Sequence, residues 1–300
     1  MIISASRRTD IPAYYSEWFI NRIKAGSVLV RNPRNPRQVS EIILASDVVR
    51  GIVFWTKNPA TMMKYLPELS DYMYYFQFTL TPYERDIEPN LPAKTAELLQ
   101  IFKRLSTIIG PDRIIWRYDP ILINEKYSIN YHIRAFHTMA KELSGSTKKV
   151  IISFIDTHYR NVKRNLKALG LKDLENEQKV EFVRKLVAIA GDYNVVVESC
   201  SEYLDLQHLG IKPARCIDYQ LFSKLLGCDF LASKDKNQRP ECGCMPSVDI
   251  GVYNTCLHGC KYCYANYNQG IVARNCGLHD SLSPLLIGEV TDKDEKTVRL

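Results

Sequence analysis

The sequence lacks any long apolar run. No stretch approaches the roughly 18 apolar residues that a membrane-spanning helix needs, and residues 1–8 lack the order of a secretion signal. We therefore expect a soluble, cytoplasmic protein with no membrane partner. Core-forming residues are plentiful, because 46% of the 300 residues are hydrophobic. This composition excludes intrinsic disorder and is enough for one large or two ordinary domains.

Two nucleotide-binding fingerprints are absent as well. The sequence contains neither a P-loop nor a Gly-x-Gly-x-x-Gly segment, so nucleotide hydrolysis and Rossmann-type dinucleotide binding have no support. Internal repeats and low-complexity stretches are also missing. The 40 basic and 33 acidic residues give a net charge of +7 that is spread along the chain. This charge permits a polyanionic partner without requiring one.

Cysteine is missing from the first 199 residues and frequent afterwards. All nine cysteines lie at or after Cys200, and six of them fall between Cys242 and Cys276. A chain without an export signal does not use so many cysteines as a disulfide framework, because the cytoplasm is reducing. Metal binding is therefore the leading interpretation.

Up to about residue 230 the sequence alternates short β-rich apolar runs with amphipathic helical stretches. This pattern is typical of parallel strands joined by crossover helices and predicts an α/β fold, a partial (β/α)6 TIM-like barrel. The six predicted strands cover residues 2–5, 51–55, 74–79, 113–117, 149–154 and 194–198. The main predicted helices cover residues 14–25, 94–109, 129–143 and 177–190.

Two further segments complete the predicted organisation. A turn rich in Pro and Arg within residues 27–43 predicts an extra hairpin. The polar run 233–240 is typical of a linker. We therefore expect a barrel over residues 1–232 and a C-terminal cysteine-rich segment over residues 233–300 that folds over the barrel mouth.

Polar residues follow every predicted strand. In parallel α/β barrels the chemistry lies at the carboxyl ends of the strands, where these residues would meet. An alternative is that strand ends are polar because they meet solvent. Arg117 and Asp119 are two residues apart and would share a strand face. The candidate catalytic and substrate-binding residues are Arg7, Asp10, Lys57, Arg117, Asp119 and Glu198.

The strongest single signal is a C-x3-C-x2-C run formed by Cys256, Cys260 and Cys263. Thiolates this close together can hold one iron–sulfur cluster, and three of them leave one iron without a protein ligand. An open iron can bind a substrate or a cofactor.

This spacing, with an aromatic residue (Tyr262) before the last cysteine, resembles the radical S-adenosylmethionine superfamily. The resemblance implies a 4Fe-4S cluster whose fourth iron is chelated by S-adenosylmethionine, with Tyr262 beside the cofactor. In that superfamily the motif normally follows the first barrel strand, whereas here it follows the last, so we expect a permuted arrangement. No Gly-Gly-Glu-like segment for the methionine amino group follows any strand.

The rest of the chain resembles the domain of unknown function 1848 family. The resemblance rests on residues 6–12, Ser-Arg-Arg-Thr-Asp-Ile-Pro, and on Asp249-Ile250-Gly251-x-Tyr253-x-x-Cys256. It extends over nearly the whole chain.

A second set of cysteines has the number required to enclose a cluster completely. This set, Cys200, Cys216, Cys242 and Cys244, predicts an auxiliary 4Fe-4S cluster. An alternative is that Cys200 and Cys216 are ordinary buried thiols. Cys228 is expected in the core, and Cys276 has no partner at motif spacing.

These features together predict a radical S-adenosylmethionine-type enzyme with S-adenosyl-L-methionine as cofactor. We expect a small-molecule or nucleic-acid-derived substrate and an electron donor such as flavodoxin or ferredoxin. One alternative is an iron–sulfur electron-transfer protein. Another is a zinc-stabilised nucleic-acid-binding or repair module, in which His258 could supply a nitrogen ligand. We expect iron rather than zinc, and His258 facing solvent beside Gly259.

Overall fold

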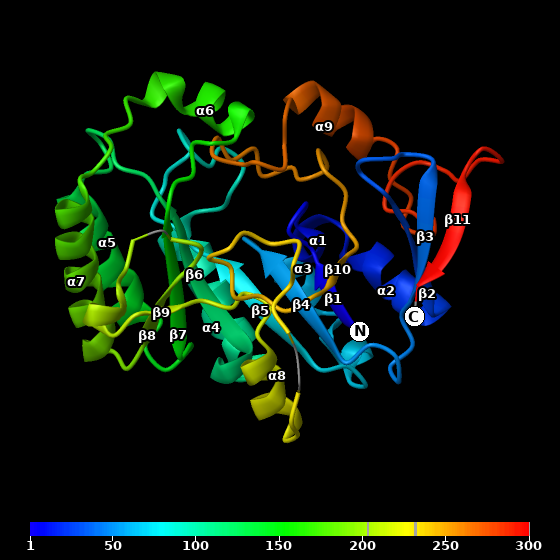
Figure 1. The fold of residues 1–300 in the computed structure, drawn as a ribbon, viewed down its shortest axis with the longest axis horizontal. Helices are drawn as coiled ribbons and strands as arrows, with labels where there is room; N and C mark the ends of the chain where they lie inside the picture. Colours follow the sequence, from blue (N-terminus) through cyan, green and yellow to red (C-terminus); the bar gives the residue numbers. More distant parts are fainter. Residues whose placement is uncertain (203, 231–232, 300) are drawn as a thin grey trace.

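An eight-stranded parallel sheet forms the centre of the protein, which we describe from a computed structural model covering residues 1–202, 204–230 and 233–299 (Figure 1). From β1 to β9 the strands lie side by side in chain order, and β10 is added on the free side of β1. In sheet order the strands are β10 (Val248–Asp249), β1 (Ile2–Ala5), β4 (Gly51–Thr56), β5 (Tyr74–Thr79), β6 (Ile114–Ile121), β7 (Lys149–Phe154), β8 (Val196–Ser199) and β9 (Lys212–Pro213).

The α/β class and all six predicted strands are confirmed. β8 starts two residues later than expected, because Asn194 adopts a positive φ of 57° in the turn that ends the preceding helix. The ladder ends at β10 on one side and at β9 on the other. Within the described residues no ladder joins these two strands.

The predicted helices are also present. They correspond to α2 (Ser16–Ala25), α4 (Leu99–Ile109), α5 (Ile129–Glu142) and α7 (Asn176–Asp192), and a π-helical turn, η2 (Lys94–Leu98), leads into α4. The remaining helical segments are α1 (Ile11–Tyr14), α3 (Ala60–Met63), η1 (Leu66–Leu69), η3 (Pro111–Arg113), α6 (Arg160–Leu166), η4 (Lys167–Leu169), η5 (Gln207–Leu209), α8 (Tyr219–Leu226) and α9 (Gln269–Cys276). None of the helices in the described ranges is long and apolar enough to cross a membrane.

Successive strand residues point to opposite faces of the sheet, and both faces are buried. On one face Phe54, Phe76 and Trp116 pack against α2, α4, α5 and α7. On the other face Tyr75 packs against Phe222 of α8 and the loops around it. Each fully buried Phe side chain contributes roughly 1.5–3 kcal/mol to folding. Burial on both faces explains why the strand segments of the sequence are almost continuously apolar.

A second, three-stranded sheet lies at the edge of the molecule (Figure 1). The predicted hairpin is confirmed as β2 (Ser27–Arg31) and β3 (Gln38–Ile43), which pair antiparallel. The C-terminal strand β11 (Glu295–Arg299) pairs parallel with β3, a pairing that the sequence did not predict. Residues 233–300 thus contribute β10 to the central sheet and β11 to the small sheet. The predicted boundary between a barrel over residues 1–232 and a cysteine-rich segment over residues 233–300 stays a prediction.

The Asp249 carboxylate fastens β10 to the end of β1. It accepts hydrogen bonds from the hydroxyls of Ser4 (2.9 Å) and Ser6 (2.6 Å) and from the backbone N–H groups of Arg7 (2.8 Å) and Gly251 (3.0 Å). These donors lie more than 240 residues away in sequence, apart from Gly251. One carboxylate therefore joins two segments that lie far apart in the sequence.

We predict that Asp249→Ala lowers the free energy of unfolding by about 2–4 kcal/mol, because several mostly buried donors lose their acceptor. Urea denaturation followed by circular dichroism measures this change. Asp292→Ala, which removes an exposed carboxylate, is the control and should change stability by less than about 0.5 kcal/mol. Equal effects of the two substitutions would contradict this account of Asp249.

Candidate functional site

The loop that carries the C-x3-C-x2-C run lies against the carboxyl ends of β1, β4 and β5. The Tyr264 hydroxyl donates to the Arg7 carbonyl oxygen (2.8 Å), and the Lys261 N–H donates to the Ile87 carbonyl (3.0 Å). The Asn90 amide donates to the carbonyl oxygen of Leu257 (2.7 Å). These contacts hold the loop against segments that follow β1 and β5.

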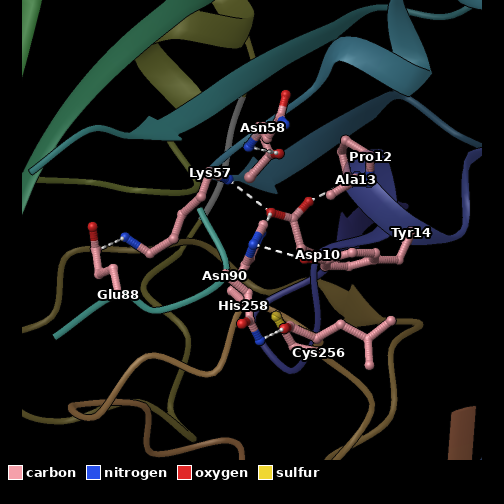
Figure 2. Close-up of polar contacts among 12 residues, drawn as sticks. Asp10, Pro12, Ala13, Tyr14, Lys57, Asn58, Glu88, Asn90, Cys256 and His258 are labelled. Carbon is pink, nitrogen blue, oxygen red and sulfur yellow. Dashed lines mark hydrogen bonds and ion pairs between the residues drawn. The ribbon is translucent and has the colours of Figure 1, made fainter. Parts of the chain in front are cut away.

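Asp10 connects this loop to the ends of two strands (Figure 2). Its carboxylate caps α1 by accepting from the Ala13 N–H (2.9 Å) and also accepts from the Lys57 N–H (2.7 Å). The same carboxylate lies 2.7 Å from the His258 Nε2 atom, and the His258 Nδ1 atom lies 2.8 Å from the Tyr14 hydroxyl. His258 is 3% exposed. The expectation that His258 faces solvent is therefore wrong, because a carboxylate and a phenol satisfy both of its ring nitrogens.

A fully buried carboxylate, Glu88, lies beside the same loop. The Lys57 ammonium donates to it at 2.7 Å (Figure 2). The Thr81 hydroxyl donates to it at 2.8 Å, and Lys94 and the Tyr262 hydroxyl also donate to it. Burial by itself raises the pKa of Glu88, but the two ammonium groups outweigh burial and lower this pKa to about 2. Two cations and one anion give this buried group a net positive charge next to Cys260.

The three motif cysteines are half-buried and lie near one another. Burial raises the pKa of Cys260 to about 12, although Lys57 and Lys94 act in the opposite direction. Burial also raises the pKa of Cys256, and negative charge on Asp10, Cys263 and Cys260 raises it further. Burial therefore favours the protonated form of these thiols. A bound metal would replace the protons, because a coordinated thiol is deprotonated.

The second set of cysteines also comes together. The Sγ atoms of Cys200 and Cys216 are 3.6 Å apart, and the thiols of Cys216, Cys242 and Cys244 are close enough to shift one another's pKa. The Arg117 guanidinium donates to the Cys216 Sγ atom at 2.8 Å. Four thiols from the end of β8, the loop before α8 and the segment before β10 thus form one continuous group.

The pKa values within this group differ. The pKa of Cys216 is raised to about 11, because hydrogen bonding to Cys244 and burial outweigh the opposing hydrogen bond to Cys200 and the Arg117 charge. Hydrogen bonding to Cys244 lowers the pKa of Cys242 to about 7. Cys242 is therefore the most readily ionised thiol of the group.

Two arginines lie beside the second group of cysteines. The guanidinium carbons of Arg7 and Arg117 each lie 5.2 Å from the centre of the Trp55 ring. Arg117 also pairs with Asp119, which accepts from the Ser153 hydroxyl as well. The Arg7 Nη2 atom is buried and has no hydrogen-bond partner among the described residues. An unpartnered buried donor is unusual and indicates a position where an anionic group could bind.

Glu198 is placed differently from the other predicted site residues. It pairs at 2.8 Å with Lys149, the first residue of β7, which also pairs with Asp218 at 3.5 Å. These contacts lie toward the amino end of the sheet. The structure therefore brings Arg7, Asp10, Lys57, Arg117 and Asp119 to the strand ends, but not Glu198.

Within the described residues no three His, Cys, Asp or Glu side chains converge as they would around a single metal ion. A four-iron cluster makes a different demand, because each cysteine binds a different iron and the thiolates stand around the cluster. The buried thiols, the adjacent cations and the unpartnered Arg7 donor fit the chemistry of such a group. We find no ready single-ion site.

The sequence model of a protein family, described as "Domain of unknown function (DUF1848)", matches residues 2–265. The chain belongs to this family. No curated protein matches the sequence. Among solved structures the chain is similar to the dihydropyrimidinase of Brevibacillus agri, at 9% identity, over 62% of this chain and 36% of that one, with a TM-score of 0.27. The chain thus spans about a third of the length of that enzyme, and a similarity this weak carries no argument.

The two segments that identify this family in the sequence contact each other. The Asp249 carboxylate accepts from the Ser6 hydroxyl and the Arg7 N–H, and the Gly251 carbonyl oxygen accepts from the Arg8 guanidinium. A Cβ atom on Gly251 would lie 2.1 Å from the Ser6 Oγ atom, so only glycine fits there. The two segments of the DUF1848 chain therefore form one structural unit.

Sequence reasoning missed several residues of this site. Glu88 and Lys94 lie in the segment after β5, nine or more residues beyond the end of the strand. Only the residues directly after each predicted strand were candidates, so these two were not among them. His258 lies inside the cysteine motif, and this position is the signal in the sequence that places it at the site. Cys228 is exposed rather than in the core, because it lies in the turn that ends α8.

Cys276 lacks a partner at motif spacing, yet it lies close to the cysteine loop in space. Its Sγ atom is 3.3 Å from both the Tyr15 hydroxyl and the carbonyl oxygen of Thr255, the residue before Cys256. It therefore helps to position the start of the motif.

We predict that Glu88→Gln lowers the free energy of unfolding by about 3–5 kcal/mol at neutral pH, because two buried ammonium groups lose their counterion. Glu88 contributes this stability fully above its unfolded pKa of 4.5 and loses it as the pH falls toward about 2. The difference between wild type and variant should therefore shrink over this range in urea titrations. Glu84→Gln, which breaks an exposed pair with Lys126, should cost about 0.5 kcal/mol or less. A constant difference from pH 7 to pH 2 would contradict the assignment.

Proposed function

We propose that this protein is an iron–sulfur enzyme of the radical S-adenosylmethionine type. In this proposal Cys256, Cys260 and Cys263 hold a 4Fe-4S cluster with one iron left open for S-adenosyl-L-methionine. One observation supports it above the others: the three motif cysteines lie half-buried together at the strand ends, next to the net positive charge around Glu88. The DUF1848 family has no assigned function, so the proposal rests on the site.

The proposed architecture is a partial (β/α)6 barrel over residues 1–232 with an iron–sulfur segment over residues 233–300. The parallel strands in chain order support the barrel. The contacts of the cysteine loop with Arg7, Asp10 and Ile87 support a C-terminal segment that closes over the strand ends. Active sites of such barrels lie at these ends.

The chain's own residues have distinct roles in this proposal. Lys57 and Lys94 offset the negative charge that three thiolates bring into a buried site. Tyr262 stays fixed by its hydrogen bond to Glu88, and Asp10 orients the loop through His258. Arg7 has a free donor for a carboxylate of the cofactor or substrate. When bound, the reduced cluster would supply the electron for reductive cleavage of S-adenosyl-L-methionine.

We also propose an auxiliary 4Fe-4S cluster held by Cys200, Cys216, Cys242 and Cys244. Their grouping around Arg117 supports this assignment. A cluster with four protein ligands has no open iron, so it suits electron relay. This feature favours a second candidate function, an iron–sulfur electron-transfer protein that does not cleave S-adenosyl-L-methionine.

The remaining assignments follow from this chemistry. Reduction of the cluster calls for an electron donor such as flavodoxin or ferredoxin. A reducing cytoplasm would keep all nine cysteines as free thiols, as the structure describes them. The substrate is a small molecule or is derived from nucleic acid, and Arg117 and Asp119 are the candidates to contact it.

Anaerobically reconstituted protein should contain about four iron and four sulfide per cluster and show a reducible 4Fe-4S signal in electron paramagnetic resonance. Adding S-adenosyl-L-methionine to the reduced protein should perturb this signal and release 5'-deoxyadenosine. Cys260→Ala should abolish both effects, whereas Cys228→Ala, which removes an exposed thiol outside both groups, should change neither. Stoichiometric zinc without sulfide would refute the proposal, and a cluster signal indifferent to the cofactor would favour electron transfer.

The auxiliary cluster is tested by replacing Cys242 and Cys244 together with alanine. Iron content should fall by about half, while the signal that responds to S-adenosyl-L-methionine remains, because the motif cysteines are untouched. Loss of both signals at once would point to a single shared site. Unchanged iron content would remove the auxiliary cluster.

A further inference from the structure

Over residues 1–202, 204–230 and 233–299, exposed aromatic side chains are confined to one place. The sequence has 18 Tyr, 10 Phe and 3 Trp. Over the residues that the structure describes, only Tyr159, Tyr264 and Tyr267 are exposed, at 38%, 38% and 48%. Large aromatic rings are normally at least partly buried. Exposure of three in one region therefore calls for an explanation.

These three tyrosines lie on one surface made by α6 and the loop after the cysteine motif. The rings of Tyr159 and Tyr264 are stacked, with centres 5.3 Å apart. The Asn161 amide donates to the carbonyl oxygens of Cys263 (3.0 Å) and Tyr264 (3.2 Å), and the Arg164 guanidinium donates to the Tyr267 carbonyl (2.7 Å). Figure 1 shows α6 at the same end of the molecule as α9, with this loop between them.

α6 presents a basic face beside these rings. Residues 160–167 contain four basic residues and no acidic one. The four, Arg160, Lys163, Arg164 and Lys167, are all exposed. Their spacing of i, i+3, i+4 and i+7 places them along one side of the helix, opposite the buried Val162 and Leu166.

A further arginine extends this surface. The Arg239 guanidinium lies 5.8 Å from the Tyr159 ring centre and donates to its hydroxyl at 3.1 Å. Arg239 also pairs with Asp156 at 2.9 Å, so its charge is partly balanced. The helix cations are the main source of positive charge here.

We propose that α6 together with Tyr159, Tyr264 and Tyr267 forms a binding surface for single-stranded nucleic acid. Lysine and arginine side chains bind the phosphates, and exposed aromatic rings stack with unpaired bases. A duplex keeps its base faces covered and would use only the cations. Tyr264 directly follows Cys263 in the sequence, so a strand bound here passes next to the cysteine motif. This surface requires no cluster, and the proposal therefore stands or falls separately from the proposed function.

Fluorescence anisotropy with labelled oligonucleotides tests the proposal on the full chain. A single strand of about 12 nucleotides, within the site sizes of known single-strand binders, should bind more tightly than the duplex of the same sequence. Its affinity should fall steeply with salt, because phosphate contacts release counterions. Equal binding of the two oligonucleotides would overturn the proposal. Capture by phosphatidylserine vesicles without oligonucleotide binding would also overturn it and assign the surface to a membrane.

Two sets of variants separate the charges from the rings. Lys163→Gln with Lys167→Gln should reduce the salt slope by about 1.4, or 0.7 for each lost phosphate contact. Lys293→Gln with Lys296→Gln removes the same charge from exposed positions near and within β11 and should leave the slope unchanged. Tyr159→Ala should weaken binding about tenfold, and Tyr159→Phe should restore it. Equal effects of the two lysine pairs, or an unchanged affinity of Tyr159→Ala, would refute the proposal.

Discussion

The Asp10 carboxylate accepts hydrogen bonds from three segments that are far apart in the sequence: the start of α1, the turn after β4 and His258 inside the cysteine motif. This one group ties all three segments together at the strand ends. A carboxylate can do this because its two oxygens accept several donors at once. The Tyr14 hydroxyl fixes His258 from the other side. The histidine within the motif is thus a structural residue that joins the loop to the sheet.

Burial of charge is the second constraint. Glu88, Lys57 and Lys94 are costly to bury singly and tolerable only as a group. The group carries one more positive than negative charge, and it lies against thiols whose own ionisation burial opposes. In the second group the Arg117 guanidinium likewise lies against a thiol, that of Cys216. Each set of cysteines therefore has a buried cation that favours its thiolate form.

The sequence predicted the parallel strands well, because a sheet that is buried on both faces produces apolar runs that periodicity detects. It also predicted which strand ends carry Arg7, Asp10, Lys57 and Arg117. It could not predict the partners of these residues. Glu88 and Lys94 reach Lys57 from a long loop, and β11 reaches β3 across more than 250 residues. Such pairings depend on tertiary packing, which produces no periodic pattern in the sequence.

Glu198 illustrates a limit within a correctly predicted strand. Its position near the end of β8 suggested a place with the other charged residues, but its side chain points toward Lys149 in a deeper layer. Strand position fixes the face of the sheet that a residue occupies. It does not fix the direction in which a long side chain runs along that face.

The contact between Ser6 and Asp249 spans 243 residues, and this separation has a consequence for biosynthesis. A ribosome adds about 5–20 residues per second, so the amino-terminal strand waits on the order of 10–50 s for the carboxylate that completes its end. Until then the Ser6 hydroxyl, the Arg7 N–H and the Asp10 carboxylate lack their C-terminal partners. The sheet can assemble progressively in chain order as the strands emerge, whereas the cysteine site is completed only after residues 249–263 have been made.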